Sequence, residues 1–528
     1  MSDPAPSATL VAIPVAAPPG GVPAIELRGI SKAFGPVQAN KDISIRVMPG
    51  TIHGIIGENG AGKSTLMSIL YGFYRADAGE ILIDGRPVTI PDSQAAIRAG
   101  IGMVFQHFKL VETFTVLENV VLGAEEGRLL RPSLAKARAQ LRQLADEYEL
   151  DVDPDALIED LGVGMQQRVE ILKALYRNAR ILILDEPTGV LTPPEADHLF
   201  RILGNLKAQG KTIVLITHKL REIMEITDTV SVMRRGEMTA TVRTADTSPP
   251  DLAELMVGRK VLLRVDKAEA RPGAPVLEVE NLRVVDADGV ERLRGVSLSV
   301  CAGEVLGIAG VAGNGQSELL EVLGGYMRAT GTVRLKGREI DLAGGAAGRS
   351  RRDAGIGHVP EDRQQEGLVL DFAAWENGVL GYHHRDAYNA GPVMDRGAMK
   401  ADCVAKMARF DVRPPNPLLA AKSFSGGNQQ KLVVAREIES NPDLLLIGQP
   451  TRGVDIGAIE FIHKQIIALR DQGKAILLVS VELDEILSLS DRIAVMFDGR
   501  LMGERTPAAT DARELGLMMA GVAGAEAA

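Results

Sequence analysis

The chain has little of several features that mark particular classes of protein. Its 528 residues include only two cysteines, Cys301 and Cys403, far apart and outside any Cys-x-x-Cys or Cys/His ligand spacing. A disulfide framework or zinc site is therefore not expected, and a reducing compartment fits. Positive charge is not in excess, since 59 Lys and Arg face 69 Asp and Glu, which argues against a nucleic-acid-binding protein. No run of 18 apolar residues occurs, so we expect no membrane-spanning helix.

The N-terminal segment also lacks the pattern of a secretory signal. Residues 1–23 are rich in Ala and Pro, and Pro14, Pro18 and Pro19 interrupt any apolar core. This composition predicts a disordered tail. The rest of the chain has ordinary globular composition, with 45% hydrophobic and 24% charged residues, and its length predicts two to four domains.

The chain contains an internal repeat. Short segments of the first half return in the same order in the second, at an offset of 253 residues between Gly57 and Gly310 and 263 between Pro187 and Pro450. A period this long indicates duplicated domains rather than a solenoid. We predict domains at residues 24–258 and 276–521, a proline-containing linker at 259–275, and a short tail at 522–528.

Each half alternates short apolar strands with helices. In the first half, residues 52–56, 181–184 and 213–216 are apolar runs typical of buried strands, and residues 64–70 are typical of a helix. Strands that alternate with helices predict an α/β fold with a mostly parallel sheet.

Residues 57–64 read Gly-Glu-Asn-Gly-Ala-Gly-Lys-Ser, which matches the phosphate-binding pattern GxxxxGK[ST] between a strand and a helix. The glycines let backbone N–H groups approach phosphate oxygens, Lys63 reaches the β- and γ-phosphates, and Ser64 ligates Mg²⁺. The second half repeats the pattern at residues 310–317, but Gln316 replaces the lysine.

Five further residues of the first half are candidates for the same site. Asp185 and Glu186 end a predicted strand, where one carboxylate can hold Mg²⁺ and the next can polarise the attacking water. His218 closes the following strand, and Gln106 and Phe34 flank the region. Each has a plainer interpretation: a solvated turn, a strand-end histidine, a polar loop residue and a core phenylalanine.

Taken together, these motifs resemble the ATP-binding subunits of ABC transporters over about residues 24–521. The resemblance implies two tandem P-loop ATPase domains, each with a mixed sheet core, an antiparallel β subdomain and a helical signature subdomain. It identifies Lys63 with the Walker A lysine, Gln106 with the Q-loop, Asp185 and Glu186 with Walker B, His218 with the switch histidine and Phe34 with the adenine-stacking aromatic. Residues 161–165 and 424–428 match the signature motif.

The residue roles that the resemblance implies fall into three groups. Catalysis is assigned to Glu186, His218 and Gln106, and Mg²⁺ binding to Ser64, Gln106 and Asp185. ATP binding is assigned to Phe34, Gly57, Glu58, Asn59, Gly60, Ala61, Gly62, Lys63, Ser64, Thr65, Asp185, Ser425, Gly426, Gly427 and Asp455.

The departures from the family pattern fall into one composite site. In ABC dimers each ATP lies between the Walker motifs of one half and the signature and D-loop of the other. The first-half Walker motifs are intact and would pair with Ser425, Gly427 and Asp455. The second half instead carries Gln316, Glu361, Gly448, Gln449 and Val481, and would pair with Gly162 and Thr192. The resemblance therefore implies one hydrolysing site and one degenerate site.

The fused arrangement resembles the ATPases of nucleoside and monosaccharide importers. The run from Gly448 to Ala458 is most similar to the nucleoside branch, and the sugar branch is the alternative. A soluble ribosome-associated ABC protein and a structural scaffold fit less well, because the linker is short and the first-half motifs are intact. The resemblance implies two membrane permease subunits, an extracytoplasmic substrate-binding protein, a peripheral position on the cytoplasmic face of the cell membrane, and no nucleic-acid partner.

Overall fold

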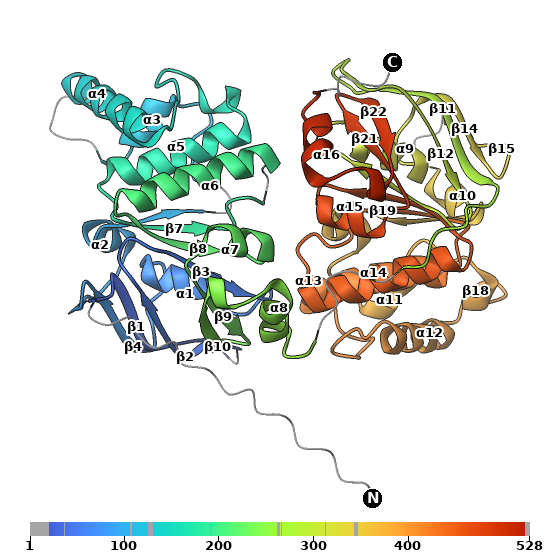
Figure 1. The fold of residues 1–528 in the computed structure, drawn as a ribbon. Helices are drawn as coiled ribbons and strands as arrows, with labels where there is room; N and C mark the ends of the chain where they lie inside the picture. Colours follow the sequence, from blue (N-terminus) through green and yellow to red (C-terminus); the bar gives the residue numbers. More distant parts are fainter. Residues whose placement is uncertain are drawn as a thin grey trace, which may run out of the picture. The chain divides into compact units, whose positions relative to one another are not determined.

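The structure is a computed structural model of the whole chain (Figure 1). It describes residues 21–35, 37–105, 108–124, 130–189, 191, 193–260, 265, 267–311, 313–342 and 347–522. Its contacts divide the chain into two compact units, Met1–Val261 and Leu262–Ala528. Most of the predicted N-terminal tail, Gln106, Thr192, part of the predicted linker and nearly all of the predicted C-terminal tail lie outside the described residues.

The first unit has two sheets. The antiparallel sheet has the order β2 (Val37–Val47), β1 (Ile25–Phe34), β4 (Ala78–Ile83) and β5 (Arg86–Pro87). The mixed sheet has the order β10 (Glu237–Arg243), β9 (Thr229–Arg234), β3 (Ile52–Gly57), β8 (Thr212–Ile216), β7 (Ile181–Asp185) and β6 (Ile101–Val104). Every pair in it is parallel except β9–β10. The strands and the helix predicted from the apolar runs of the first half are confirmed.

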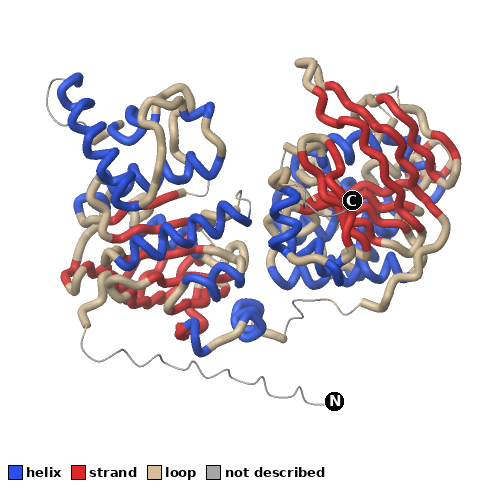
Figure 2. The backbone as a smooth tube through the Cα atoms, turned by 45° about the horizontal axis from the view of Figure 1, so that its top comes forward, coloured by secondary structure: helices blue, strands red, loops and turns tan. Residues whose placement is uncertain are grey.

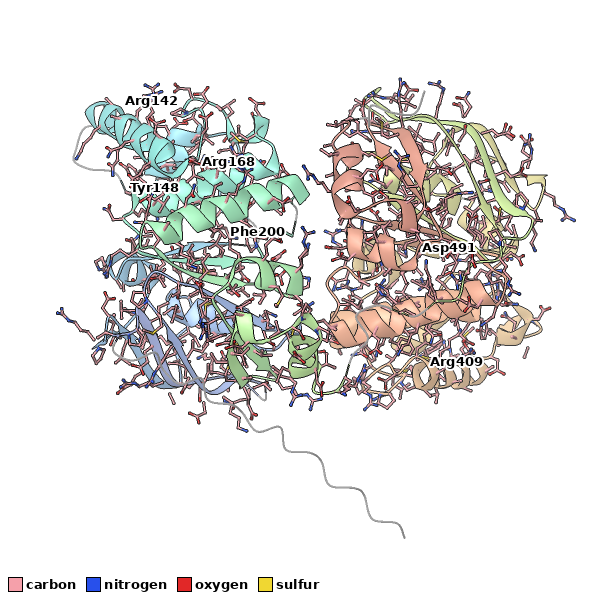
Figure 3. All side chains as sticks on the ribbon, viewed as in Figure 1. Arg142, Tyr148, Arg168, Phe200, Arg409 and Asp491 are labelled. Atoms are coloured by element: carbon pink, nitrogen blue, oxygen red, sulfur yellow. The ribbon has the colours of Figure 1, made fainter. Side chains whose placement is uncertain are left out.

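The helices of the first unit follow the α/β alternation. They are α1 (Lys63–Leu70), α2 (Ser93–Arg98), α3 (Val116–Val121), α4 (Leu130–Tyr148), α5 (Val163–Tyr176), α6 (Pro193–Ala208), α7 (Leu220–Ile226) and α8 (Pro249–Val257). Within this unit, α3, α4, α5 and α6 gather at one end and β1, β2 and β4 at the other (Figure 1). Figure 3 labels Tyr148 at the end of α4, Arg168 on α5 and Phe200 on α6.

The second unit repeats this plan. Its antiparallel sheet has the order β12 (Glu291–Cys301), β11 (Pro275–Val285), β14 (Thr330–Leu335) and β15 (Arg338–Glu339). Its mixed sheet has the order β16 (Ile356–Val359), β19 (Leu444–Gly448), β20 (Ala475–Ser480), β13 (Val305–Ala309), β21 (Arg492–Phe497) and β22 (Arg500–Arg505). A two-stranded hairpin, β17 (Asn389–Ala390) and β18 (Val393–Met394), is added. Strands and helices of both units are coloured in Figure 2.

The helices of the second unit are α9 (Gln316–Gly324), α10 (Gly348–Asp353), α11 (Ala374–Gly378), α12 (Arg396–Arg409), α13 (Gly426–Glu439), α14 (Ile456–Asp471), α15 (Leu483–Leu489) and α16 (Ala512–Met519). A π-helical turn at Arg363–Gly367 follows β16. Asp491, labelled in Figure 3, accepts hydrogen bonds from the Val305 amide and from Arg470 Nη1, each at 2.9 Å, which ties β13 to α14. The sequence places Pro275 in the linker, but it begins β11.

The helix after each phosphate loop is held by an apolar core. In the first unit, Leu66, Met67 and Leu70 of α1 share one buried cluster with side chains of both sheets. In the second unit, Leu319 and Leu323 of α9 do the same. Burying each such side chain contributes about 1.5–3 kcal/mol. These cores hold the N-terminal end of each helix next to the carboxyl end of the strand that precedes it, β3 or β13.

In the part of the chain that the structure describes, no helix combines the length and the apolar character that crossing a bilayer requires.

Candidate nucleotide site

The loop between β3 and α1 has the shape of a phosphate cradle. Gly60 and Gly62 have φ of +81° and +95°, a region that residues with a side chain rarely adopt. A Cβ on Gly62 would lie 2.2 Å from the carbonyl oxygen of Ala39, so only glycine fits there. Asn40 Nδ2 donates to the Gly62 carbonyl at 3.0 Å and holds the loop. The loop thus presents the N-terminal end of α1, where backbone N–H groups attract anions.

Lys63 lies across this loop. Its Nζ donates to the carbonyl oxygens of Gly57 at 2.6 Å and Glu58 at 3.1 Å. Burial lowers the pKa of Lys63, while the negative charges of Glu186, Asp185 and Glu58 oppose that shift. The ammonium is therefore held beside the position that a phosphate would take. Ser64, next to it, is exposed.

Asp185 ends β7 and Glu186 follows it, and the two carboxylates have different pKa shifts. Burial, followed by the charge of Glu186, raises the pKa of Asp185 to about 6, while Lys63 and a hydrogen bond with Ser64 oppose the rise. Burial also opposes ionisation of Glu186, but the hydrogen bond and charge of His218, together with the charges of Lys63 and Lys219, lower its pKa. His218 Nδ1 lies 2.9 Å from Glu186 Oε1. The arrangement combines an ionised carboxylate, a histidine that orients it and a second carboxylate facing the loop serine.

Phe34 lies at the end of β1 and is 42% exposed, which excludes the core position that the sequence left open. Its ring makes an edge contact with Tyr74 at 5.1 Å between centroids, and Lys32 Nζ lies 5.6 Å from its centre. An exposed ring held by neighbours on one side can stack on a planar ligand with the other.

The second unit brings the signature residues and Asp455 together. Ser425 caps α13, and its hydroxyl accepts a hydrogen bond from Asn428 Nδ2 at 2.8 Å. Asp455 caps α14 by accepting from the Ala458 amide at 2.7 Å, and a Cβ on Gly427 would lie 2.8 Å from its Oδ2. The buried Gly427 therefore lies directly against the Asp455 carboxylate. In the first unit Gly162 caps α5.

The second unit has no acid and histidine pair where the first has Glu186 and His218. Gln449 has φ of +46°, as Glu186 does, so the left-handed backbone at this position is the same. Gln449 Oε1, however, accepts a hydrogen bond from the Val481 amide at 3.3 Å. An amide in this position cannot accept a proton from water, so the second unit lacks the base.

Sequence reasoning did not find the residues that hold these motifs in place. Gln167 Nε2 on α5 donates to the Pro187 carbonyl at 2.7 Å and links the first signature helix to the Walker B turn. Arg363 Nη1 donates to the Arg452 carbonyl at 2.6 Å and links the turn after β16 to the segment before Asp455. The sequence contains a sign of the role of Gln167, because its Gln-Gln pair is repeated in the second half at residues 429–430. It contains no such sign for Arg363. Gln106 lies outside the described residues, so its predicted role stays a prediction.

Each unit has a cavity beside this machinery. In the first unit it measures about 640 Å³ and is lined by apolar, basic and acidic side chains that include Phe105, Lys173, Glu170 and Asp185. In the second it measures about 310 Å³ and is lined by Tyr326, Arg352, His358, Glu366 and others. Both lie next to the segment that follows β6 or β16.

Comparison with known proteins gives consistent matches. A family profile described as ABC transporter matches residues 40–189 and 293–452. The guanosine import ATP-binding protein of Bacillus subtilis is 49% identical over 94% of this chain and 97% of its own length. The nucleoside import ATP-binding protein of Lactococcus lactis is 46% identical over 94% and 98%. The glucose import ATP-binding protein of Haloferax volcanii is 46% identical over 94% and 96%.

Among solved structures, an archaeal ribosome recycling factor in complex with a ribosomal stalk protein matches 90% of this chain and 90% of its own, with a TM-score of 0.58. At 20% identity, this likeness shows the two-cassette fold alone.

Proposed function

We propose that this chain, which belongs to the ABC transporter family, is the ATP-hydrolysing subunit of a membrane importer for nucleosides. ATP binding and hydrolysis follow from the family. The pairing of Glu186 with His218 beside Lys63 is the observation that supports hydrolysis in the first half.

The chemistry of this site follows from its charges. Glu186, with its lowered pKa, is ionised at neutral pH and accepts the proton of the attacking water. His218 holds the carboxylate through the hydrogen bond at 2.9 Å. Lys63 neutralises charge on the phosphates, and the loop amides of residues 58–63 hold them in place. Phe34 stacks on the adenine.

The described residues fit a magnesium ion that a nucleotide helps to hold. They contain no group of three or more His, Cys, Asp or Glu side chains arranged to bind a metal ion. Mg²⁺ in nucleotide sites takes one or two carboxylates together with phosphate oxygens. Ser64 and Asp185, which share a hydrogen bond, would hold it, with Gln106 as the predicted third ligand. When bound, the ion supplies positive charge to the phosphates.

The second half completes this site in the proposal. Ser425, Gly426, Gly427 and Asp455 would approach the γ-phosphate held by Lys63, as in the family dimer. The support is local: Gly427 lies against the Asp455 carboxylate, and Ser425 is exposed. The degenerate site would then pair the second-half loop with Gly162 and Thr192.

The transport partners are two membrane permease subunits, with an extracytoplasmic binding protein that delivers substrate. The chain would lie on the cytoplasmic face of the membrane without crossing it. Cytoplasmic helices of the permeases would dock near positions 106 and 361. The cavities lined by Phe105 in the first unit and by Pro360 in the second support this proposal, since these residues adjoin the two positions in the sequence.

The nucleoside assignment depends on the relatives that match nearly the whole chain, two of which are named for guanosine or nucleoside import. Sugar import is the second candidate, because a glucose importer subunit is as similar as the Lactococcus protein. The test is uptake by proteoliposomes that hold the complete transporter. ATP-dependent accumulation of labelled guanosine or uridine, without uptake of glucose or ribose, supports nucleoside import. Uptake of the sugars alone would assign the chain to the second candidate.

A further inference from the structure

The second half has lost the Walker B acid from its strand but has a carboxylate in the same place. Asp185 ends β7 in the first unit, and Gly448 ends β19 at the matching position of the second. A Cβ on Gly448 would lie 2.6 Å from Cγ of Glu361. The Glu361 side chain therefore occupies the space that an acid at position 448 would need.

The carboxylate of Glu361 also has the matching partner. Ser317 Oγ donates to Glu361 Oε2 at 2.6 Å. In the first unit the loop serine, Ser64, hydrogen-bonds Asp185. The loop serine of each unit is thus paired with one carboxylate, which comes from the strand end in the first unit and from the segment after β16 in the second.

The sequence shows that the acid stands on a different segment in each half. The first half has a glutamine two residues after its edge strand, at Gln106, and an acid at Asp185. The second half has an acid two residues after its edge strand, at Glu361, and glycine at Gly448. Because β16 and β19 are parallel neighbours, their carboxyl ends lie side by side, and the acid can come from either.

A second observation places an unused polar group at the same loop. Gln316 is 4% exposed, and its Oε1 has no hydrogen-bond partner among the described residues. Its side-chain nitrogen lies 1.8 Å from where a Cβ on Gly310 would be, so the amide fills the mouth of the loop. Buried polar atoms without a partner are uncommon, and a bound ligand or ordered water is a usual explanation.

We infer that Ser317 and Glu361 form a divalent-cation site that lets the second half bind Mg·ATP without hydrolysing it. Mg²⁺ needs an oxygen ligand set that one carboxylate, the loop hydroxyl and the phosphates supply. Hydrolysis is absent because Gln449 and Val481 replace the base and its histidine. The inference deepens the proposed function and rests on it, since both assume that each half binds ATP at its phosphate loop.

The test measures binding of Mn²⁺ and the slowly hydrolysed analogue ATPγS to the full-length chain. Electron paramagnetic resonance counts bound Mn²⁺, and equilibrium dialysis counts nucleotide. Wild type should bind two Mn·ATPγS per chain. A background variant that carries Lys63→Ala and Asp185→Asn should bind one, at the second-half site.

In that background, Glu361→Gln keeps the size of the side chain but removes its charge. It should weaken Mn²⁺-dependent binding by about 10–100-fold, a loss seen even when a hydrogen-bonding partner of a metal ligand is removed. A rescue variant then returns the acid to the strand, as Glu361→Ala with Gly448→Asp. Alanine is needed because Cγ of residue 361 would collide with the new side chain, and the end of the Leu320 side chain, 2.8 Å from the same Cβ, must also move. This variant should again bind one Mn·ATPγS.

Each outcome decides the inference. It is overturned if the background variant binds no nucleotide, or if Glu361→Gln binds Mn²⁺ as tightly as the background does. It is also overturned if Gly448→Asp with Glu361→Ala fails to restore Mn·ATPγS binding while its melting curve matches that of the background. Failure of the proposed function looks different, because the wild-type chain itself would then bind no Mn·ATPγS, whereas failure of the inference alone leaves wild type with one bound nucleotide.

Discussion

At the scale of single residues, the difference between the two halves is a difference in charge. Lys63, Asp185 and Glu186 are charged groups at positions where the second half has Gln316, Gly448 and Gln449. The backbone around them is the same, as the shared φ of +46° at Glu186 and Gln449 shows. At these positions the two units therefore differ in side-chain charge, while the backbone conformation at Glu186 and Gln449 is the same.

Glu186→Gln should abolish turnover and leave ATP binding intact. The substitution removes the proton acceptor but keeps the size of the side chain, and loss of a general base costs about 10²–10⁴-fold in rate. The measurements are the ATPase rate and nucleotide retention in the assembled transporter. Gln449→Ala is the matched control and should change the rate little. A rate near wild type in Glu186→Gln would mean that another group is the base.

Lys63→Ala should reduce ATPase activity far more than Gln316→Ala. Lys63 gives the phosphates a full charge, whereas Gln316 can offer only neutral hydrogen bonds, about half as strong as charge-assisted ones. Both variants are compared in the reconstituted complex after their melting temperatures have been matched to wild type. Equal losses from the two substitutions would show that the second-half loop takes part in hydrolysis.

At the scale of elements, the central strand β3 carries a buried histidine. His53 Nε2 lies 2.8 Å from Ser231 Oγ on β9, and Ser231 Oγ lies 2.8 Å from Thr241 Oγ1 on β10. This chain of hydrogen bonds links three neighbouring strands in the sheet that supports the loop. Burial lowers the pKa of His53 to about 4, from 6.5.

The first unit should therefore lose stability as the pH falls from 6.5 towards 4. In this range the unfolded chain binds a proton at residue 53 and the folded chain does not, so unfolding becomes more favourable as acid is added. The slope reaches about 1.4 kcal/mol per pH unit for one such group. Urea unfolding followed by circular dichroism at pH 7, 5.5 and 4.5 measures it, and His53→Gln should show a shallower loss.

The chain offers two controls for this measurement. His383 is exposed, so His383→Gln should keep the acid sensitivity of wild type. The single tryptophan, Trp375, belongs to the second unit, and its fluorescence should report the same midpoint in wild type and His53→Gln. An unchanged pH profile in His53→Gln would show that His53 does not titrate in this range.

The elements also show how far the sequence could predict the structure. The strand before Lys63, the helix after it and the strand before Asp185 are apolar runs next to glycine or acidic residues, and local pattern is enough to find them. The link between Ser317 and Glu361 could not be found in this way. It depends on β16 lying beside β19, although 87 residues separate Glu361 from Gly448, and no local pattern encodes that distance. From the sequence alone, Gly448 indicates only that the acid of this strand has been lost. The structure shows that the Glu361 side chain fills the space of that acid.

At the scale of the whole molecule, the proposal assigns the intact Walker motifs to one half and the intact signature to the other. Ser425 and Asp455 are kept in the half that lacks Lys63 and Glu186 counterparts, and their own counterparts, Gly162 and Thr192, have changed. This distribution is expected if a single composite site is under selection for hydrolysis. It predicts that a change in the second half inactivates the chemistry of the first.

Ser425→Arg should therefore inactivate as strongly as a Walker substitution, and Gly162→Arg should be milder. Both residues cap the helix that follows the signature, and both are exposed. A Cβ on Gly162 would meet no described atom within 4 Å, and its φ of −60° suits any residue, so arginine fits there without disturbing its own unit. Both variants place an arginine at the same position of a signature, and each signature would face a different nucleotide. An arginine at 425 would block approach to the γ-phosphate at Lys63, whereas one at 162 would face the site without a base.

ATPase rates of the two variants in the assembled transporter decide between these alternatives. A greater loss in Gly162→Arg, with both proteins folded, would show that each signature serves the nucleotide of its own half or that the second site drives turnover.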